Sequence, residues 1–163
     1  YTQNGYTFGI YDLKGSKMLL KKIYSEYTRL SEYGQSFSLL FARLIVAYGF
    51  YEPAMMKWSD INSVAEWFGS MGIPFATLNA YMAASTEAVG VVLLTLGLFT
   101  RVISIPLIVV MIVAILTVHL AHGFSAGVNG FEIPLYYMIF LLIFVSHGAG
   151  KFSLDRVIFG ERN

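Results

Sequence analysis

The sequence predicts an all-α fold: an integral membrane four-helix bundle with short amphipathic helices at the membrane surfaces. Residues 79–98 and 102–122 are two apolar runs that are joined by only three residues. Each run is close to the roughly 20 residues that a helix needs to cross a bilayer, and the short connector makes the two helices antiparallel neighbours. Two further apolar runs, residues 35–51 and 131–147, complete the four predicted spans.

The composition also indicates a membrane protein. Of the 163 residues, 56% are hydrophobic and 13% are charged, whereas a soluble domain carries about 25% charged residues. The mean hydropathy is +0.63. The chain has no cysteine, which excludes a disulfide framework, iron–sulfur clusters and cysteine-bound zinc. Its length accommodates one domain.

Residues 1–34 form a predicted N-terminal extension with an amphipathic helix. Apolar residues recur in it at helical spacing, with basic residues on the other faces: Leu20, Ile23, Tyr24, Tyr27 and Leu30. We expect this helix to lie on the cytoplasmic surface before Gly34 turns the chain into the membrane; an ordinary solvated helix is the alternative. Residues 1–17 lack the apolar region of a cleavable signal peptide, and Met18 is a candidate natural start.

The first span, residues 35–51, carries Arg43 near its middle. The connector after it contains a second amphipathic segment, at about residues 60–71, with apolar residues on one helical face. Asp60 is suited to cap the start of this segment, and Gly72 to end it. The pattern predicts a short helix on the outer membrane surface.

The second span, residues 79–98, carries Glu87. The third span, residues 102–122, carries His119 and His122 near its outer end. Both spans are otherwise apolar, so these ionisable groups are candidates for a functional site.

The fourth span, residues 131–147, begins with Glu132 and ends at His147. The predicted membrane bundle extends over residues 35–150. Residues 151–163 form a predicted amphipathic tail that returns to the cytoplasmic surface.

Basic residues alternate along the chain in the way that sets membrane orientation. They precede the first span, occupy the connector between the second and third spans, and follow the fourth: Lys14, Lys17, Lys21, Lys22, Arg29, Arg101, Lys151, Arg156 and Arg162. The connector at residues 123–130 contains no lysine or arginine. The positive-inside rule predicts a multi-pass protein of the bacterial inner membrane with both termini in the cytoplasm.

Arg43 and Glu87 are the most informative side chains, because a charged group inside a bilayer costs about 3 kcal/mol or more on insertion scales. Each lies eight residues from the start of its predicted span, so at about 1.5 Å per residue both lie about 12 Å deep. We therefore expect an Arg43–Glu87 pair that faces the bundle interior. Two roles remain open: a structural pair that fixes helix register, or a catalytic and ligand-binding pair that handles protons.

A second polar group lies at the predicted outer face: Glu52, Lys57, His119, His122, Asn129 and Glu132. His119 and His122 are one helical turn apart and are, with Glu132, weak candidates for a metal site; histidines that only hydrogen-bond are commoner, so we expect no metal. His147 lies at the opposite end of its span, which argues against a pair of haem ligands. Glu52, Lys57, Asn129 and Glu132 are predicted to dock a partner or substrate.

The polar residues and short motifs stand in a recognisable order: Arg43, Gly49-Phe50, Lys57-Trp58, Glu87-Ala88-Val89-Gly90, Gly97-Leu98-Phe99-Thr100-Arg101, Asn129-Gly130-Phe131-Glu132 and the segment from Gly148 to Asp155. This ordered set resembles the DoxX family of small bacterial membrane proteins, over roughly residues 35–155. The resemblance implies a four-helix inner-membrane protein with an embedded arginine and glutamate. The family takes its name from a subunit of a thiosulfate:quinone or quinol-oxidase system.

The leading functional hypothesis is a membrane subunit linked to quinone-dependent redox chemistry with a partner protein, and hence a subunit of a quinone-linked oxidoreductase. Tyr81 and Tyr137 are candidates to line a slot for the flat quinone ring, together with Arg43 and Glu87. The sequence contains no cofactor motif, so electrons would come from a partner or pass directly to a bound quinone.

The alternatives are a non-enzymatic anchor or assembly module, alone or as a homo-oligomer, and a transporter of a small molecule or peptide. Nothing in the sequence indicates a nucleic-acid partner.

Overall fold

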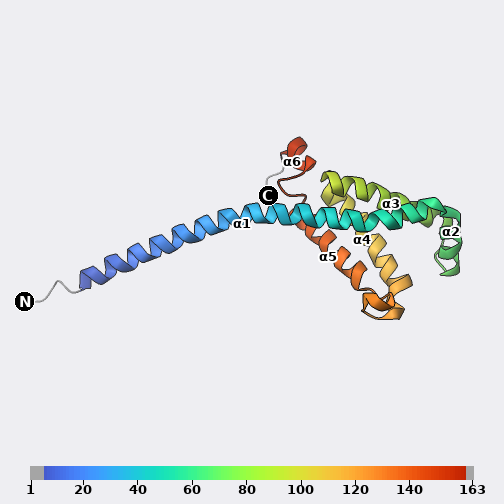
Figure 1. The fold of residues 1–163 in the computed structure, drawn as a ribbon, viewed down its shortest axis with the longest axis horizontal. Coiled ribbons are helices and arrows are strands. Elements are labelled where there is room, and N and C mark those ends of the chain that lie inside the picture. The colour runs from blue at the N-terminus through green and yellow to red at the C-terminus, as the bar shows by residue number, and fades with distance from the viewer. Residues whose placement is uncertain (1–5, 161–163) are drawn as a thin grey trace, which may run out of the picture. The chain divides into compact units, whose positions relative to one another are not determined.

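The computed structural model describes the backbone of residues 6–160 and the side chains of residues 15–31 and 33–160. Every regular element in this part of the chain is helical (Figure 1), which confirms the predicted all-α class. The elements are α1 Tyr6–Ser59, α2 Ile61–Ser70, α3 Ala76–Leu96, α4 Thr100–Ala114, a π-helix Ile115–His119, 3-10 turns Leu120–His122 and Ala126–Val128, α5 Glu132–His147 and α6 Leu154–Phe159.

The chain divides into two compact units, one up to Ser36 and one from Phe37 onward. In the described part of the first unit, α1 exposes an apolar face that includes Leu20, Ile23 and Leu30, as its periodicity predicts. The predicted extension and tail also include residues 1–5 and 161–163, which lie outside the described residues.

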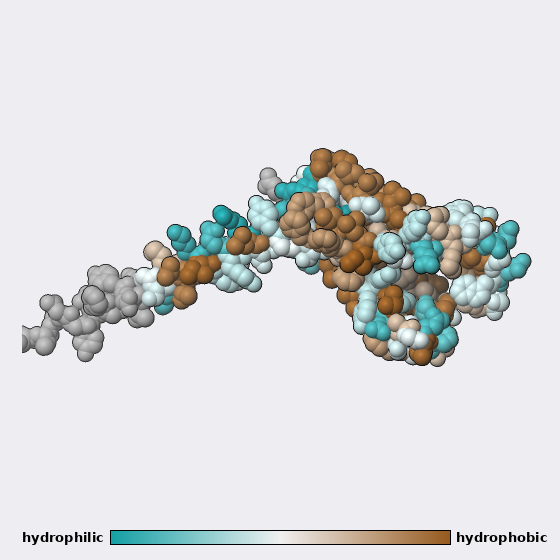
Figure 2. All heavy atoms as spheres, in the orientation of Figure 1, coloured by the Kyte–Doolittle hydropathy of each residue, from teal (hydrophilic) through white to brown (hydrophobic). Residues whose placement is uncertain are grey.

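Three helical segments are long and apolar enough to cross a membrane: Gly15–Ser59 within α1, Ala76–Leu96, and Thr100–His122. The last two match the predicted second and third spans closely. Helix α5 is apolar but shorter, with 16 residues, so the fourth span stays a prediction. Figure 2 shows hydrophobic side chains on the outer surface over α3, where lipid contact is expected.

The helix that contains the predicted first span is longer than the sequence predicts. Helix α1 does not turn at Gly34 and does not end at Tyr51; it runs through Pro53 to Ser59. Glycine costs only about 1 kcal/mol in a helix interior relative to alanine. Proline is tolerated in membrane helices because neighbouring groups satisfy the carbonyl that it leaves free. The extra turns after Tyr51 carry Lys57 within the same helix.

The short helix after α1 confirms the second amphipathic prediction. Asp60 is the N-cap of α2, and its carboxylate accepts hydrogen bonds from Ser63 N–H (3.1 Å) and Ser63 Oγ (2.6 Å). The apolar face of α2 buries Phe68. These two hydrogen bonds hold the pKa of Asp60 below its ordinary value.

The core of the second unit lies where α1, α3, α4 and α5 meet. Its largest fully buried apolar side chains are Phe50, Leu94, Leu107, Leu141 and Phe144. The packing brings polar side chains of α1 and of the C-terminal segment against α3 and α4, so it positions the sites described below.

Asp60→Ala is expected to speed amide hydrogen exchange in the first turn of α2, because Ser63 loses both hydrogen bonds to the cap. The stabilisation from the cap depends on pH, because the folded protein holds the pKa of Asp60 below its ordinary value. The stabilisation is complete above the ordinary aspartate pKa and is lost as the pH falls through the lowered value. Hydrogen-exchange mass spectrometry measures both effects. Asn62→Ala is the control in the same turn, and equal exchange in both variants would contradict the capping role.

Candidate functional site

The structure gathers the buried polar residues into two clusters rather than one. Arg43 Nη1 donates a hydrogen bond to the carbonyl of Leu94 (2.8 Å), whereas Glu87 forms an ion pair with Lys57. The predicted Arg43–Glu87 pair is therefore wrong. Glu87 and Leu94 are about two turns, or 10 Å, apart along α3, and the continuation of α1 beyond Tyr51 brings Lys57 to Glu87 instead.

The first cluster, which we call the clamp, consists of Arg43, Ser153 and Asp155 around the turn between α3 and α4. Helix α3 ends in a Schellman motif at Gly97 (φ +66°), with hydrogen bonds from Gly97 N–H to Leu94 O and from Leu98 N–H to Leu93 O. The Arg43 guanidinium binds Leu94 O at this end, where the helix carries a partial negative charge. Arg43 is fully buried.

The C-terminal segment supplies the other half of the clamp. Arg43 Nη2 donates to the carbonyl of Phe152 (2.6 Å). Asp155 accepts hydrogen bonds from the backbone N–H of Phe99 (2.7 Å) and Thr100 (3.1 Å), and its own N–H binds Gly97 O. Its carboxylate thus caps the positive end of α4, and it also interacts electrostatically with Arg43.

Sequence reasoning missed Asp155 and Ser153. Ser153 Oγ donates to Gly150 O (2.7 Å) and caps α6, and Asp155 is 4% exposed. The available signal was the motif from Gly148 to Asp155, which places an acidic residue directly after an apolar span. The clamp explains that motif as a means of binding the α3–α4 turn.

The second cluster is the Lys57–Glu87 ion pair at the C-terminal end of α1. Lys57 Nζ donates to both carboxylate oxygens of Glu87, at 2.9 Å and 2.7 Å. The side chain of Glu87 is 3% exposed and that of Lys57 is 18% exposed. Trp58 Nε1 donates to Ala84 O (3.2 Å) and fixes this part of α1 on α3. An ammonium group has three N–H donors, so one donor of Lys57 remains for another partner.

This ion pair lies in the wall of a cavity of about 600 Å³, which we call the ion-pair cavity. Most of its lining is apolar or aromatic, including Phe50, Trp67, Phe68, Met111 and Tyr137. Its polar groups are few: Lys57, Asn79, Thr86, Glu87, Thr117, His119 and Asn129. Pockets for small organic ligands combine such an apolar lining with a few placed polar groups.

The structure separates the two predicted tyrosines. Tyr137 lines the ion-pair cavity, with its ring 5.7 Å from that of Phe50. Tyr81 is not part of the lining; it packs edge-on against Trp58 at 6.0 Å and is 42% exposed. Of the predicted docking residues, Lys57 and Asn129 line this cavity, and Glu52 lines a different hollow on α1.

The weak metal site is not assembled among the described residues, where no three histidine, aspartate or glutamate side chains form a metal-binding group. His119 Nδ1 donates to Asn129 O (2.8 Å), and His122 Nδ1 donates to Val118 O (2.9 Å). The Glu132 carboxylate binds the backbone N–H of Ala126 (2.9 Å) and the Tyr136 hydroxyl (3.1 Å). These side chains order the outer connector.

Comparison with known proteins identifies relatives over most of the chain. The DoxX family model matches residues 38–120. A Haemophilus influenzae protein with the name "Uncharacterized protein" is 35% identical over 129 residues, which cover 77% of this chain and 85% of that protein. No solved structure matches the chain.

Two further relatives have more informative names. The "Putative oxidoreductase CatD" of Bacillus subtilis is 30% identical over 125 residues, covering 76% of this chain and 90% of that protein. The "Uncharacterized membrane protein Rv3486" of Mycobacterium tuberculosis is 32% identical over 130 residues, covering 73% and 80%.

Gly97→Ala is expected to destabilise the protein strongly, because a Cβ there would overlap Arg43 Nη1 and lie 2.7 Å from Ser153 Cβ. The control is Gly160→Ala, because Gly160 has the same left-handed backbone (φ +62°, ψ 27°, against φ +66°, ψ 40° at Gly97) but open space around it. Both variants carry the backbone cost of about 1–2 kcal/mol, and only Gly97→Ala adds the steric cost. Thermal unfolding in detergent measures the difference; equal losses of stability in the two variants would contradict the clamp.

Proposed function

The chain belongs to the DoxX family of membrane proteins, and from this premise we propose that it is a subunit that binds a quinone in the ion-pair cavity and exchanges electrons with a partner protein. The observation that carries the proposal is a nearly buried ion pair, Lys57–Glu87, in the wall of a mainly apolar cavity of about 600 Å³. The name of the Bacillus subtilis relative, "Putative oxidoreductase CatD", points to the same class of reaction.

The cavity suits a flat ring with carbonyl oxygens. Aromatic and aliphatic side chains such as Phe50, Phe68 and Met111 provide an apolar surface for the ring. The remaining N–H donor of Lys57 is available to a carbonyl oxygen, since Glu87 takes the other two. A volume near 600 Å³ lies within the range of about 300–1,000 Å³ that is usual for small-molecule sites.

The ion pair also suits proton handling. A bound quinone supplies two-electron redox chemistry that consumes two protons on reduction. In this proposal Lys57 would hydrogen-bond a ring oxygen and pass on one of the two protons, and solvent would supply the second proton and reprotonate Lys57, whose side chain is 18% exposed. Glu87 balances the charge of Lys57 inside the apolar wall. Electrons would come from a partner protein, because this sequence contains no cofactor motif. In this proposal Arg43 holds the fold and does not contact the ligand.

We further propose that α5 is the fourth span of a four-helix bundle in the bacterial inner membrane, with both termini in the cytoplasm. Arg101, Lys151 and Arg156 lie in or beyond the clamp end of the bundle, which agrees with a cytoplasmic position for that end. The 16 residues of α5 span about 24 Å, and local thinning of the bilayer accommodates such a short helix.

The anchor hypothesis remains the second candidate, and the clamp favours it. The buried charges of the clamp are all engaged with backbone groups at helix ends, so they serve the fold. If the Lys57–Glu87 pair were equally structural, the chain would act only as a binding module for other membrane or surface proteins.

Glu87→Gln and Lys57→Met are expected to lower the amount of quinone that co-purifies with the protein in mild detergent by about tenfold or more, the loss associated with removing one charged hydrogen bond. Mass spectrometry of the extracted quinone measures it. Glu66→Gln is the control, because Glu66 is an exposed carboxylate on the neighbouring helix α2 and lines neither hollow.

Loss of one partner in a buried pair also destabilises the fold by about 3–5 kcal/mol. The double variant Lys57→Met/Glu87→Leu replaces both charges by apolar groups and is expected to remain folded without retaining quinone. A folded double variant that retains wild-type quinone would contradict the proposed site. Absence of quinone from the wild-type protein, with one stable protein partner, would favour the anchor.

A further inference from the structure

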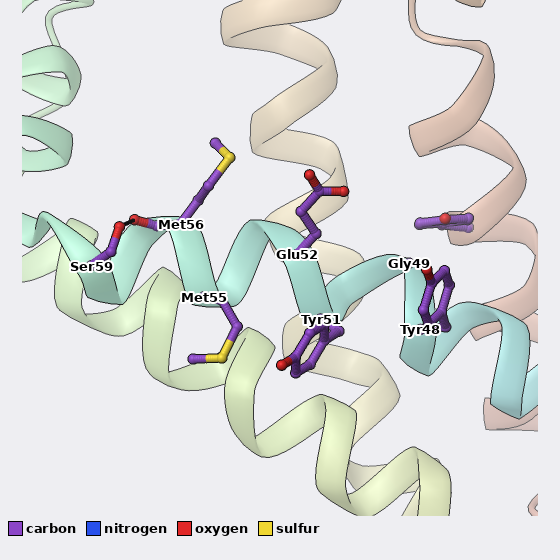
Figure 3. Close-up of a pocket in the computed structure, with 8 residues that line it drawn as sticks. Tyr48, Gly49, Tyr51, Glu52, Met55, Met56 and Ser59 are labelled. Carbon is purple, nitrogen blue, oxygen red and sulfur yellow. Dashed lines mark hydrogen bonds between the residues drawn. The ribbon is translucent and has the colours of Figure 1, made fainter.

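A second hollow, which we call the lateral groove, runs along the outer half of α1 and has a volume of about 740 Å³ (Figure 3). Tyr48, Tyr51, Met55 and Met56 supply most of its apolar surface, and its polar atoms include the Glu52 carboxylate. In Figure 3, Glu52 and Met56 project from one side of the helix and Tyr51 and Met55 from the other. Tyr48 is 79% exposed and Met56 is 66% exposed, so the groove opens outward.

The lateral groove and the ion-pair cavity share two residues, Gly49 and Tyr137. The end of the Tyr137 ring lies directly over Gly49, where an added Cβ would overlap the ring and hydroxyl. The Tyr137 hydroxyl forms no hydrogen bond with any described residue. Its ring is placed by packing, including the contact with Phe50. One aromatic side chain, without a polar tether, therefore lies between the two hollows.

We propose that the lateral groove is a subsite for the apolar tail of the ligand whose ring occupies the ion-pair cavity, with the Gly49–Tyr137 contact as the point where the tail leaves the bundle. This inference rests on the proposed function. A membrane-soluble quinone carries a hydrocarbon tail many times longer than its ring, so a tail that leaves the cavity of about 600 Å³ would continue over an adjoining apolar surface.

Two properties of the groove fit a hydrocarbon chain. It adjoins the cavity, because Gly49 and Tyr137 line both. Its methionines present flexible, polarizable side chains, which adapt to irregular apolar ligands. In this proposal Tyr137 lies between the ring in the ion-pair cavity and the tail in the lateral groove. Contacts with the tail would make the protein bind a tailed quinone more tightly than a benzoquinone without a tail.

Binding of two probes to the full-length protein in detergent micelles tests the proposal: a tail-less benzoquinone and the same ring with a decyl chain. The wild-type protein is expected to bind the decyl compound more tightly. The variant Met55→Ser/Met56→Ser is expected to weaken binding of the decyl compound by about fivefold or more, because the chain then buries less apolar surface, and to leave binding of the tail-less compound unchanged. Ile45→Ser is the control, because Ile45 is an exposed apolar residue of α1 (61%) that lines neither hollow.

The remaining outcomes distinguish failure of the tail subsite from failure of the proposed function. Equal affinity of the wild-type protein for both probes, or equal effects of the Met55/Met56 and Ile45 variants, would overturn the tail subsite and leave the ring site intact. A change in bound phospholipid by native mass spectrometry, without a change in affinity for the decyl compound, would assign the groove to a lipid chain and also overturn it. If neither probe binds the wild-type protein, the proposed function itself fails, and the subsite with it.

Discussion

Arg43 and Asp155 bind the two ends of the α3–α4 turn, and the arrangement of the membrane unit depends on this contact. A tight turn between two membrane helices leaves carbonyl groups at the end of one and N–H groups at the start of the next, and each buried group without a partner costs about 1–3 kcal/mol. The guanidinium binds a carbonyl at the negative helix end, and the carboxylate binds N–H groups at the positive end. Because Arg43 comes from α1 and Asp155 from α6, the same contacts join all four segments.

The ion-pair cavity follows from that arrangement. Once the clamp holds α1 against the C-terminal half of α3, the continuation of α1 through Pro53 carries Lys57 and Trp58 to the N-terminal half of the same helix. Side chains of α2, α4 and α5 complete the walls. The two buried charge clusters therefore differ in role. The clamp stabilises helix ends, and the Lys57–Glu87 pair places charged groups in the wall of an apolar cavity.

Hydropathy and periodicity predicted much of the fold. The second and third spans and the Asp60 cap agree with the structure to within a few residues, because length, apolar runs and capping residues are local properties. The partners of Arg43 and Glu87 could not be predicted in this way. Counting residues along a span gives the depth of a side chain in the membrane but not the side of the helix from which it projects. In addition, α1 ends at Ser59, later than predicted, so Lys57 was not expected on the same helix as Arg43. Asp155 was missed because its role depends on contacts with residues 55 and 56 positions away.

The clamp can form only late in the synthesis of the chain, because its residues are far apart in the sequence. Arg43 is made 109 residues before Phe152, one of its two hydrogen-bond partners. At about 5–20 residues per second, this interval lasts roughly 5–20 s. During that time the Arg43 guanidinium lacks the carbonyl of Phe152, and the start of α4 lacks the carboxylate of Asp155. The hydrogen bonds that complete the α3–α4 turn can therefore form only after residue 155 has been made, well after both helices of that turn.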